Sequence, residues 1–154
     1  MKKLGIAFFY GIGIAIGLIA YFLILSLFGL HENPLFSLFN PVIVGIGMYL
    51  AIIALKRKLG KKYKYQKGFK VGIKTGFIAT IIFTIFFGIY ATELNPGFIN
   101  KLLSVWDTSW HITIAMVLFT VAIMGFATTV VLTLAFMQLL KDSWNTKEAS
   151  KHKL

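Results

Sequence analysis

Few residues of this chain could carry chemistry: five acidic residues and three histidines among 154 residues, and no cysteine. Asp107 and His111 are spaced i, i+4, so on a helix they are neighbours on one face. Imidazole and carboxylate groups together can bind a metal ion. The alternative, which we favour, is that these side chains bind water and lipid headgroups, so we expect no metal and no cofactor. The weak metal candidates are His31, Glu32, Asp107 and His111.

No grouping of residues points to catalysis. A hydrolytic site needs a nucleophile or paired carboxylates in a cleft, and nothing in the sequence fixes such a geometry. Gly11–Gly17 is glycine-rich, but no strand precedes it and it lies inside an apolar run, unlike a dinucleotide-binding turn. The middle of each apolar run lacks ionisable residues, which coupled transporters keep there. We therefore predict a non-catalytic protein and argue against a transporter that works alone.

Composition indicates which elements hold these residues. The chain is 58% hydrophobic and 14% charged, with a mean hydropathy of +0.81. Soluble domains are about 45–50% apolar and about 25% charged. A small soluble domain cannot bury such an excess, and a disordered chain would be poor in aromatic residues. The composition predicts a membrane protein. Its apolar runs are uninterrupted, which favours helices over barrel strands, so we predict an all-α membrane protein.

Four apolar runs are long enough to cross a bilayer, which takes about 20 helical residues. We predict a single four-helix transmembrane domain over residues 1–154, whose third run reaches this length if Lys74 extends its amine to the headgroups. The first run is longer than the apolar region of a signal peptide, so we expect it to stay uncleaved. The approximate spans are 4–30, 35–56, 71–92 and 112–140.

Basic residues set the orientation. They gather in a predicted loop 56–74, at the N-terminus and in the tail 141–154, whereas the other two connections hold only Lys101. The positive-inside rule places both termini and this loop in the cytoplasm. We expect the loop to attract anionic phospholipid, at about 1 kcal/mol per charge; an acidic protein surface is the alternative, and nucleic acid is not expected. Its basic residues are Lys56, Arg57, Lys58, Lys61, Lys62, Lys64, Lys67, Lys70 and Lys74.

Small residues recur four positions apart in several runs. In lipid there is no hydrophobic drive between helices, so helices associate where small residues allow close packing. We predict packing within one monomer, and contact with another subunit is the alternative. The predicted helix-packing residues are Gly13, Gly17, Gly72, Gly76, Gly125 and Thr129.

The connection between the third and fourth spans contains segment 96–106, whose apolar side chains recur at i, i+4 and i+8. This pattern is typical of a short amphipathic helix lying in the outer membrane interface, where tryptophan is enriched. A lid packed over the helix bundle is the alternative. The predicted interfacial anchors are Phe98, Leu102, Trp106 and Trp110.

The order of these features resembles a known family. The Asn33–Pro34 turn, the basic segment Gly68–Gly72, the segment Leu94–Phe98 and Met124–Gly125 in the last span are similar to the bacterial inner-membrane family catalogued as domain of unknown function 4199. The resemblance covers nearly the whole chain. It implies four transmembrane helices in a bacterial cytoplasmic membrane and supplies no established activity, substrate or catalytic residues.

The leading hypothesis is a non-catalytic integral membrane protein that serves as an accessory or structural subunit of a larger bacterial inner-membrane complex. It rests on the small-residue faces, the uncharged spans and the lack of a catalytic grouping. The expected partners are the lipid bilayer and other membrane-protein subunits. One alternative is a homo-oligomeric pore or small-solute carrier lined by threonines and glycines of the third and fourth spans. The second is a membrane enzyme or metal-binding protein with an outer-face site.

Overall fold

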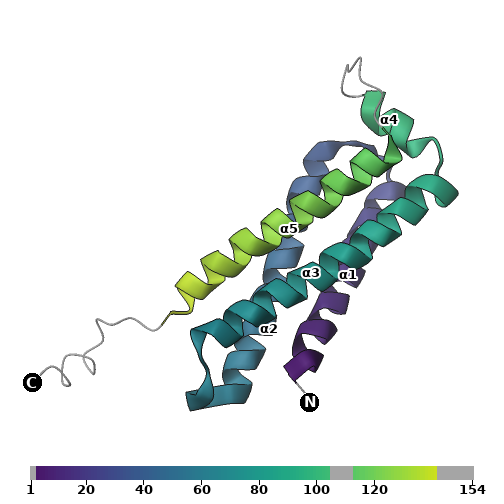
Figure 1. The fold of residues 1–154 in the computed structure, drawn as a ribbon. Coiled ribbons are helices and arrows are strands. Elements are labelled where there is room, and N and C mark those ends of the chain that lie inside the picture. Colours follow the sequence, from purple (N-terminus) through teal and green to yellow (C-terminus); the bar gives the residue numbers. More distant parts are fainter. Residues whose placement is uncertain (1–2, 105–112, 142–154) are drawn as a thin grey trace, which may run out of the picture.

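The computed structural model describes residues 3–104 and 113–141. Within these ranges all regular secondary structure is helical, and four helices are long and apolar enough to cross a membrane (Figure 1). The prediction of an all-α protein with four such helices is confirmed. They are α1 (Lys3–Leu27), α2 (Asn40–Leu59), α3 (Tyr65–Ile89) and α5 (Ile114–Leu139).

Two short 3₁₀ helices, η1 (Leu30–Glu32) and η2 (Pro34–Phe39), join α1 to α2. Gly29, with φ of +68°, adopts the left-handed conformation that lets the chain turn after α1. The side chain of Asn33 accepts a hydrogen bond from the backbone N–H of Leu35 at 3.0 Å and so caps η2. The turn therefore follows from glycine and asparagine at the positions that need them.

The predicted loop 56–74 is mostly helical, which corrects the sequence interpretation. α2 continues to Leu59, and α3 begins at Tyr65 instead of near residue 71. Only η3 (Gly60–Lys62) and two further residues connect them, and Gly60 has φ of +48°. Lysine is a good helix former, so a run of lysines marks where a helix leaves an apolar medium and not where the helix ends.

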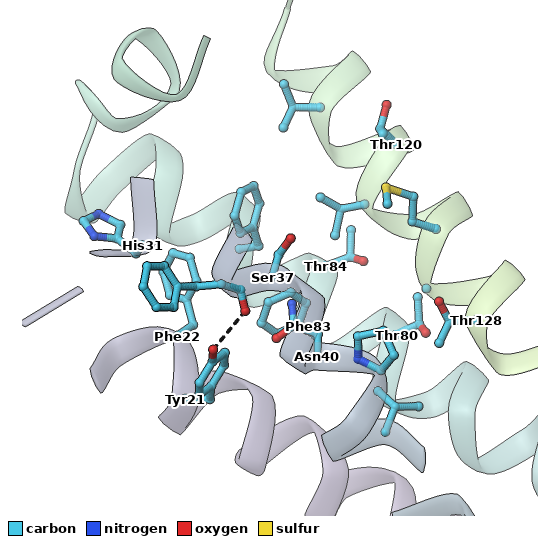
Figure 2. Close-up of a pocket in the computed structure, with 18 of the residues that line it drawn as sticks. Tyr21, Phe22, His31, Ser37, Asn40, Thr80, Phe83, Thr84, Thr120 and Thr128 are labelled. Carbon is cyan, nitrogen blue, oxygen red and sulfur yellow. Dashed lines mark hydrogen bonds between the residues drawn. The ribbon is translucent and has the colours of Figure 1, made fainter. Parts of the chain in front are cut away.

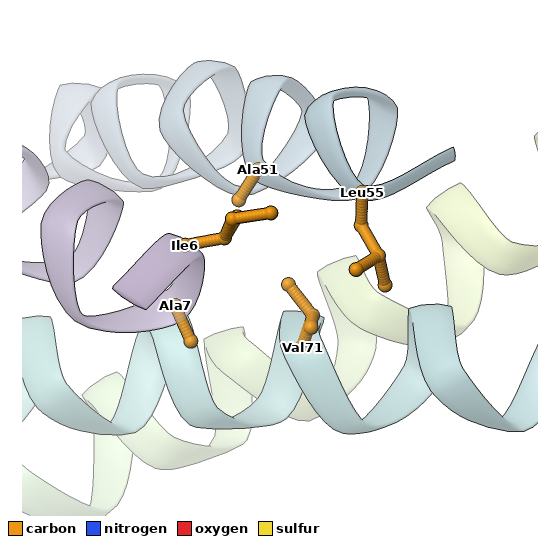
Figure 3. Packing of buried hydrophobic residues seen from close by; sticks show 5 residues of the cluster. All are labelled: Ile6, Ala7, Ala51, Leu55 and Val71. Carbon is orange, nitrogen blue, oxygen red and sulfur yellow. The ribbon is translucent and has the colours of Figure 1, made fainter. Parts of the chain in front are cut away.

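α3 is the central helix, since it packs against α1, α2 and α5, whereas α5 packs mainly on α3 (Figure 1). We call the end that holds η3 the basic end. At this end a cluster of α1, α2 and α3 side chains forms the core (Figure 3). Its buried members are Ile6, Ala7, Ala51, Leu55 and Val71.

The opposite end, here the lid end, is covered by the short helix α4 (Phe98–Ser104). α3 reaches it through one π-helical turn, η4 (Tyr90–Leu94). Phe98 of α4 is 1% exposed and packs against Phe87, Tyr90 and Ala91. This aromatic cluster fixes α4 on the bundle.

Across the α3–α5 interface, each of three glycines faces a threonine of the other helix. A Cβ atom added at Gly72 would lie 2.8 Å from Cγ2 of Thr133, closer than real Cβ atoms come to other heavy atoms. The same holds at Gly125, where a Cβ would lie 2.6 Å from Cγ2 of Thr80. The two backbones therefore approach as closely as glycine permits. The facing pairs are Gly72–Thr133, Gly76–Thr129 and Gly125–Thr80.

The threonines of α5 in this interface are satisfied within their own helix. Thr129 donates its hydroxyl to the carbonyl of Gly125 at 2.8 Å, and Thr133 donates to that of Thr129 at 2.7 Å. Such bonds to the i−4 carbonyl let a hydroxyl stay buried without a partner on another helix. The α3–α5 contact is thus held by shape.

Candidate functional site

A cavity of about 630 Å³ opens between η2, the first turns of α2 and the lid-end half of α5, with α1 and α3 behind it (Figure 2). Its origin lies in how α2 and α5 diverge. At Gly45 the helices touch, since an added Cβ would lie 3.6 Å from Cζ of Phe136, and the Tyr49 and Phe136 rings are 5.5 Å apart. Towards the lid end α5 follows α3, with Leu118 against Gly88. α2 does not follow, so a wedge remains.

The other wall of the wedge is held by α1. The hydroxyl of Tyr21 donates a hydrogen bond to the carbonyl of Phe36 in η2 at 2.9 Å (Figure 2). The Tyr21 ring also lies 6.5 Å from the Phe39 ring. These contacts hold η2 over α1 while α5 stays on α3, and the space between is the cavity.

The cavity walls are mostly apolar, with hydroxyl groups at intervals and with the side chains of His31, Asn33 and Asn40 towards the lid end. None of the lining residues that the structure describes is an aspartate, glutamate, lysine or arginine. Thr80 and Thr84 of α3 face the cavity opposite Thr120 and Thr128 of α5 (Figure 2). Thr120 donates its hydroxyl to the carbonyl of Met116 at 2.9 Å. The Oγ1 atom of Thr84 is buried and has no hydrogen-bond partner among the described residues.

At the lid end the cavity meets a histidine set among aromatic rings. The His31 ring stacks on Phe98, with centroids 5.0 Å apart and an interplanar angle of 11°, and meets the Phe22 ring edge-on. Nε2 of His31 lies 3.2 Å from the hydroxyl of Tyr90, which lies 2.7 Å from Oγ of Ser26. This chain of hydrogen bonds ties η1, η4 and α1 together beneath α4.

The candidate metal ligands are not brought together in the described part of the chain. No three histidine, aspartate or glutamate residues gather there. His31 faces Phe98, Phe22 and Tyr90. Asp107, His111 and the side chain of Glu32 lie outside the described residues.

The candidate interfacial anchor Phe98 is a core residue. At 1% exposure its side chain packs on the bundle, as the lid alternative expects, and not on lipid. For Phe98 the apolar pattern reflects this packing, since a helix face covered by protein and one covered by lipid are both apolar. α4 includes Leu102 in its backbone, whereas Trp106 and Trp110 lie outside the described residues.

The predicted lipid-binding residues lie at the basic end, on the last turn of α2, on η3, on the first half of α3 and, for Lys64, at the position just before α3. Lys56 donates a hydrogen bond to the carbonyl of Leu140 at 3.3 Å, and its ammonium lies 5.8 Å from the centre of the Tyr63 ring. Lys67 donates to the carbonyl of Lys62 at 3.1 Å. A shallow pocket beside Lys56 is lined by Ile53, Lys56, Arg57, Gly60 and Leu140.

The predicted helix-packing glycines divide into two groups. Gly72, Gly76 and Gly125 face threonines across the α3–α5 interface, and Thr129 is one of these threonines. An added Cβ at Gly17 would lie 3.3 Å from Ile43 of α2, whereas at Gly13 it would meet no described atom within 4 Å. The expectation of packing within the monomer is wrong for Gly13, because it lies on the exposed face of α1, and Gly11 faces α3 instead.

Two features of the site were missed by the sequence interpretation. The first is a cavity within one chain, since threonines of the third and fourth spans were expected only as the lining of the alternative pore or carrier. Thr80 and Thr84 are one turn apart and Thr120 and Thr128 two turns apart, which aligns each pair on one helix face. The second is the hydrogen-bonded set around Tyr90. Only His31 stood out in the sequence, because serine and tyrosine give no distinctive signal in an apolar helix.

A family model described as "Protein of unknown function (DUF4199)" matches residues 9–109. The matched segment covers most of α1 and all of α2, α3 and α4, and it ends before α5. No curated protein and no solved structure matches the chain.

Proposed function

The chain belongs to the DUF4199 family of proteins of unknown function, and we propose that it is a non-catalytic integral membrane protein that serves as an accessory subunit of a larger bacterial inner-membrane complex. Its helices α1, α2, α3 and α5 supply the four spans. The same proposal places the basic end in the cytoplasm.

The exposure of α5 carries this proposal. Three of its 26 residues are buried, Thr129, Thr133 and Met137, whereas α3 buries eight of 25. Large apolar side chains cover its other faces, among them Phe119 at 67% exposure and Val131 at 64%. In a bilayer such a helix presents most of its circumference to lipid or to helices of another protein.

Small residues on the outward side of α5 favour another helix. Ala127 and Ala135 are exposed and flank Val131 at spacings of four residues. Small side chains let a second backbone approach closely, which gives packing energy that disordered lipid chains do not give. Gly13 offers a similar exposed position on α1.

The basic end supports contact with anionic phospholipid. The pocket beside Lys56 combines the charges of Lys56 and Arg57 with apolar side chains of Ile53 and Leu140. A phosphate headgroup and the start of an acyl chain match this combination. Such an interaction would weaken as salt is raised, because exposed charges are screened.

A small-solute carrier is the second candidate, and the threonine-lined cavity favours it. The cavity is closed towards the basic end by the core cluster that includes Met48, Leu132 and Phe136. A solute would cross only if α2 and α5 separated at Gly45 and Phe136. The geometry therefore supports a binding protein or subunit better than a pore.

The test is site-specific photo-crosslinking in the native host, combined with purification in a mild detergent. We would place the crosslinking amino acid at Val131 of α5 and, as a matched control, at Ile46 of α2, which is 59% exposed. We expect a stoichiometric membrane protein to be crosslinked from position 131 and not from position 46. A second copy of the chain crosslinked from 131 would favour the homo-oligomer instead. Crosslinks to lipid alone at both positions would refute the accessory-subunit proposal.

A further inference from the structure

We propose that the cavity between η2, α2 and α5 binds a neutral single-chain amphiphile from the bilayer: one hydrocarbon chain that bears an uncharged head with a hydrogen-bonding oxygen. This goes beyond the proposed function. It does not depend on the protein joining a complex, because the cavity is built by helices of one chain.

The first argument is where the cavity opens. Its exposed lining residues lie on two sides, Asn33, Ser37 and Pro41 on the η2–α2 side and Met116, Thr120 and Met124 on the α5 side. On the α1–α3 side it is closed by the aromatic cluster around Phe22. The opening thus lies between two candidate spans, where the surrounding medium in a bilayer is hydrocarbon. An occupant enters from the membrane.

The second argument is the charge of the walls. The described lining residues include no carboxylate, ammonium or guanidinium group. Their one imidazole, that of His31, is stacked on Phe98 and lies 3.2 Å from the hydroxyl of Tyr90. An ion or charged solute would lose its hydration there without a counter-charge, which costs far more than a few hydroxyl groups return. The volume of about 630 Å³ falls in the range of roughly 300–1,000 Å³ typical of ligand sites. The occupant is therefore mostly hydrocarbon, and its polar part is uncharged.

The third argument is the depth of the unpaired hydroxyl. Thr84 lies ten residues from Lys74 and nine from Glu93, the nearest charged residues along α3 and η4. At 1.5 Å per residue these separations are about 15 Å and 13 Å. A phospholipid keeps its charged phosphate at the interface, so its head cannot reach this depth. A neutral head can, and it would pair with Oγ1 of Thr84, which has no partner among the described residues. This atom is buried in the present rotamer, so it reaches the head when the side chain rotates about χ1.

Since lipid is as apolar as the cavity walls, hydrocarbon burial gives little preference for the site over the bilayer. The preference must come from the hydrogen bond at Thr84 and from the fit between the walls. This makes the hydroxyl decisive. Thr84→Val keeps the shape and removes the bond, so we expect binding to weaken roughly 2- to 10-fold.

The experiment uses the full chain in phosphatidylcholine nanodiscs and a long-chain fatty alcohol that carries a diazirine group. The control probe is the monoalkyl phosphate with the same chain. We expect saturable labelling of α5 residues 114–128 by the alcohol, competed by unlabelled alcohol, and no saturable labelling by the phosphate. Equal labelling by the two probes, or labelling that unlabelled alcohol does not compete, would overturn the proposal.

Two matched variants locate the site. Val121→Trp fills the cavity, whereas Phe119→Trp places the same side chain on the outward face of the same helix, where residue 119 is 67% exposed. Saturable labelling should disappear in the first variant and persist in the second, and equal labelling in both would refute the assignment. If Val121→Trp elutes as aggregate, Thr84→Val is the deciding variant. An unchanged affinity of Thr84→Val for the alcohol would also refute the assignment of the site.

Discussion

The close approach of α3 and α5 makes a sharp prediction for Gly72→Ala. An added methyl group would lie 2.8 Å from Cγ2 and 2.9 Å from Oγ1 of Thr133. Thr133 is fully buried, and its hydroxyl is fixed by its bond to the carbonyl of Thr129. The side chain cannot rotate away without losing that bond, so the helices must separate.

The change in unfolding free energy can be estimated by comparing Gly72→Ala with a matched control, Gly13→Ala. Replacing glycine by alanine inside a helix stabilises it by about 0.5–1 kcal/mol, whereas overpacking a tight interface costs about 1–3 kcal/mol. Gly13→Ala adds a methyl group that meets no described atom within 4 Å, so it should gain the first term alone. Gly72→Ala gains the same helix term but also loses stability by overpacking. The two variants should therefore differ in unfolding free energy by the overpacking cost, about 1–3 kcal/mol.

The assay is equilibrium unfolding in mixed micelles of a mild detergent and dodecyl sulfate, followed by circular dichroism. The double variant Gly72→Ala/Thr133→Ala removes both close atoms and leaves Cδ1 of Ile52 at 3.4 Å, an ordinary contact. We expect a favourable coupling of about 0.5–3 kcal/mol between the two substitutions. Equal effects of Gly13→Ala and Gly72→Ala, or no coupling in the double variant, would show that shape does not hold this interface.

Three further predictions concern the lid end and the orientation. Tyr90→Phe keeps the ring contacts but removes the hydroxyl beside Ser26, so we expect the unfolding free energy to fall by about 1–3 kcal/mol. The effects of Tyr90→Phe and Ser26→Ala should not add, because both remove the same hydrogen bond, and full additivity would contradict this. Phe98→Ala should cost about 3–5 kcal/mol and speed hydrogen exchange in α4, and unchanged exchange would mean that this ring does not hold the lid. A cysteine at Lys62 should react with an impermeant maleimide only from the cytoplasmic side and one at Glu93 only from the other side, and the reverse pattern would overturn the orientation.

The helices could be predicted from sequence because hydropathy and charge act on long segments. Four uncharged runs required four long helices, and the structure has them. The same reasoning misplaced the start of α3, because it read Lys67 and Lys70 as loop residues. Both lie on the helix, where long side chains reach past the end of the apolar segment while the backbone stays helical.

The side-chain environments could not be predicted in the same way. Phe98 and Gly13 were assigned from patterns that do not distinguish lipid from protein as the neighbour. Because both neighbours are apolar, the sequence of a membrane helix carries little information on which face is buried. The structure shows which neighbour each residue has. Phe98 packs among aromatic rings, and a Cβ added at Gly13 would meet no described atom within 4 Å.

The cavity and the large exposed surface of α5 have one physical cause. α5 is matched to α3 along its length, from Thr133 at Gly72 to Leu118 at Gly88. η2 is matched to α1 instead, through the bond between Tyr21 and Phe36. Because α5 is held on α3 and η2 is held on α1, a wedge remains between α5 and η2. Neither helix can close it without losing its contact with α3 or α1. A wedge of this kind between membrane helices does not stay empty in a bilayer, and its hydroxyl groups decide which molecule fills it best.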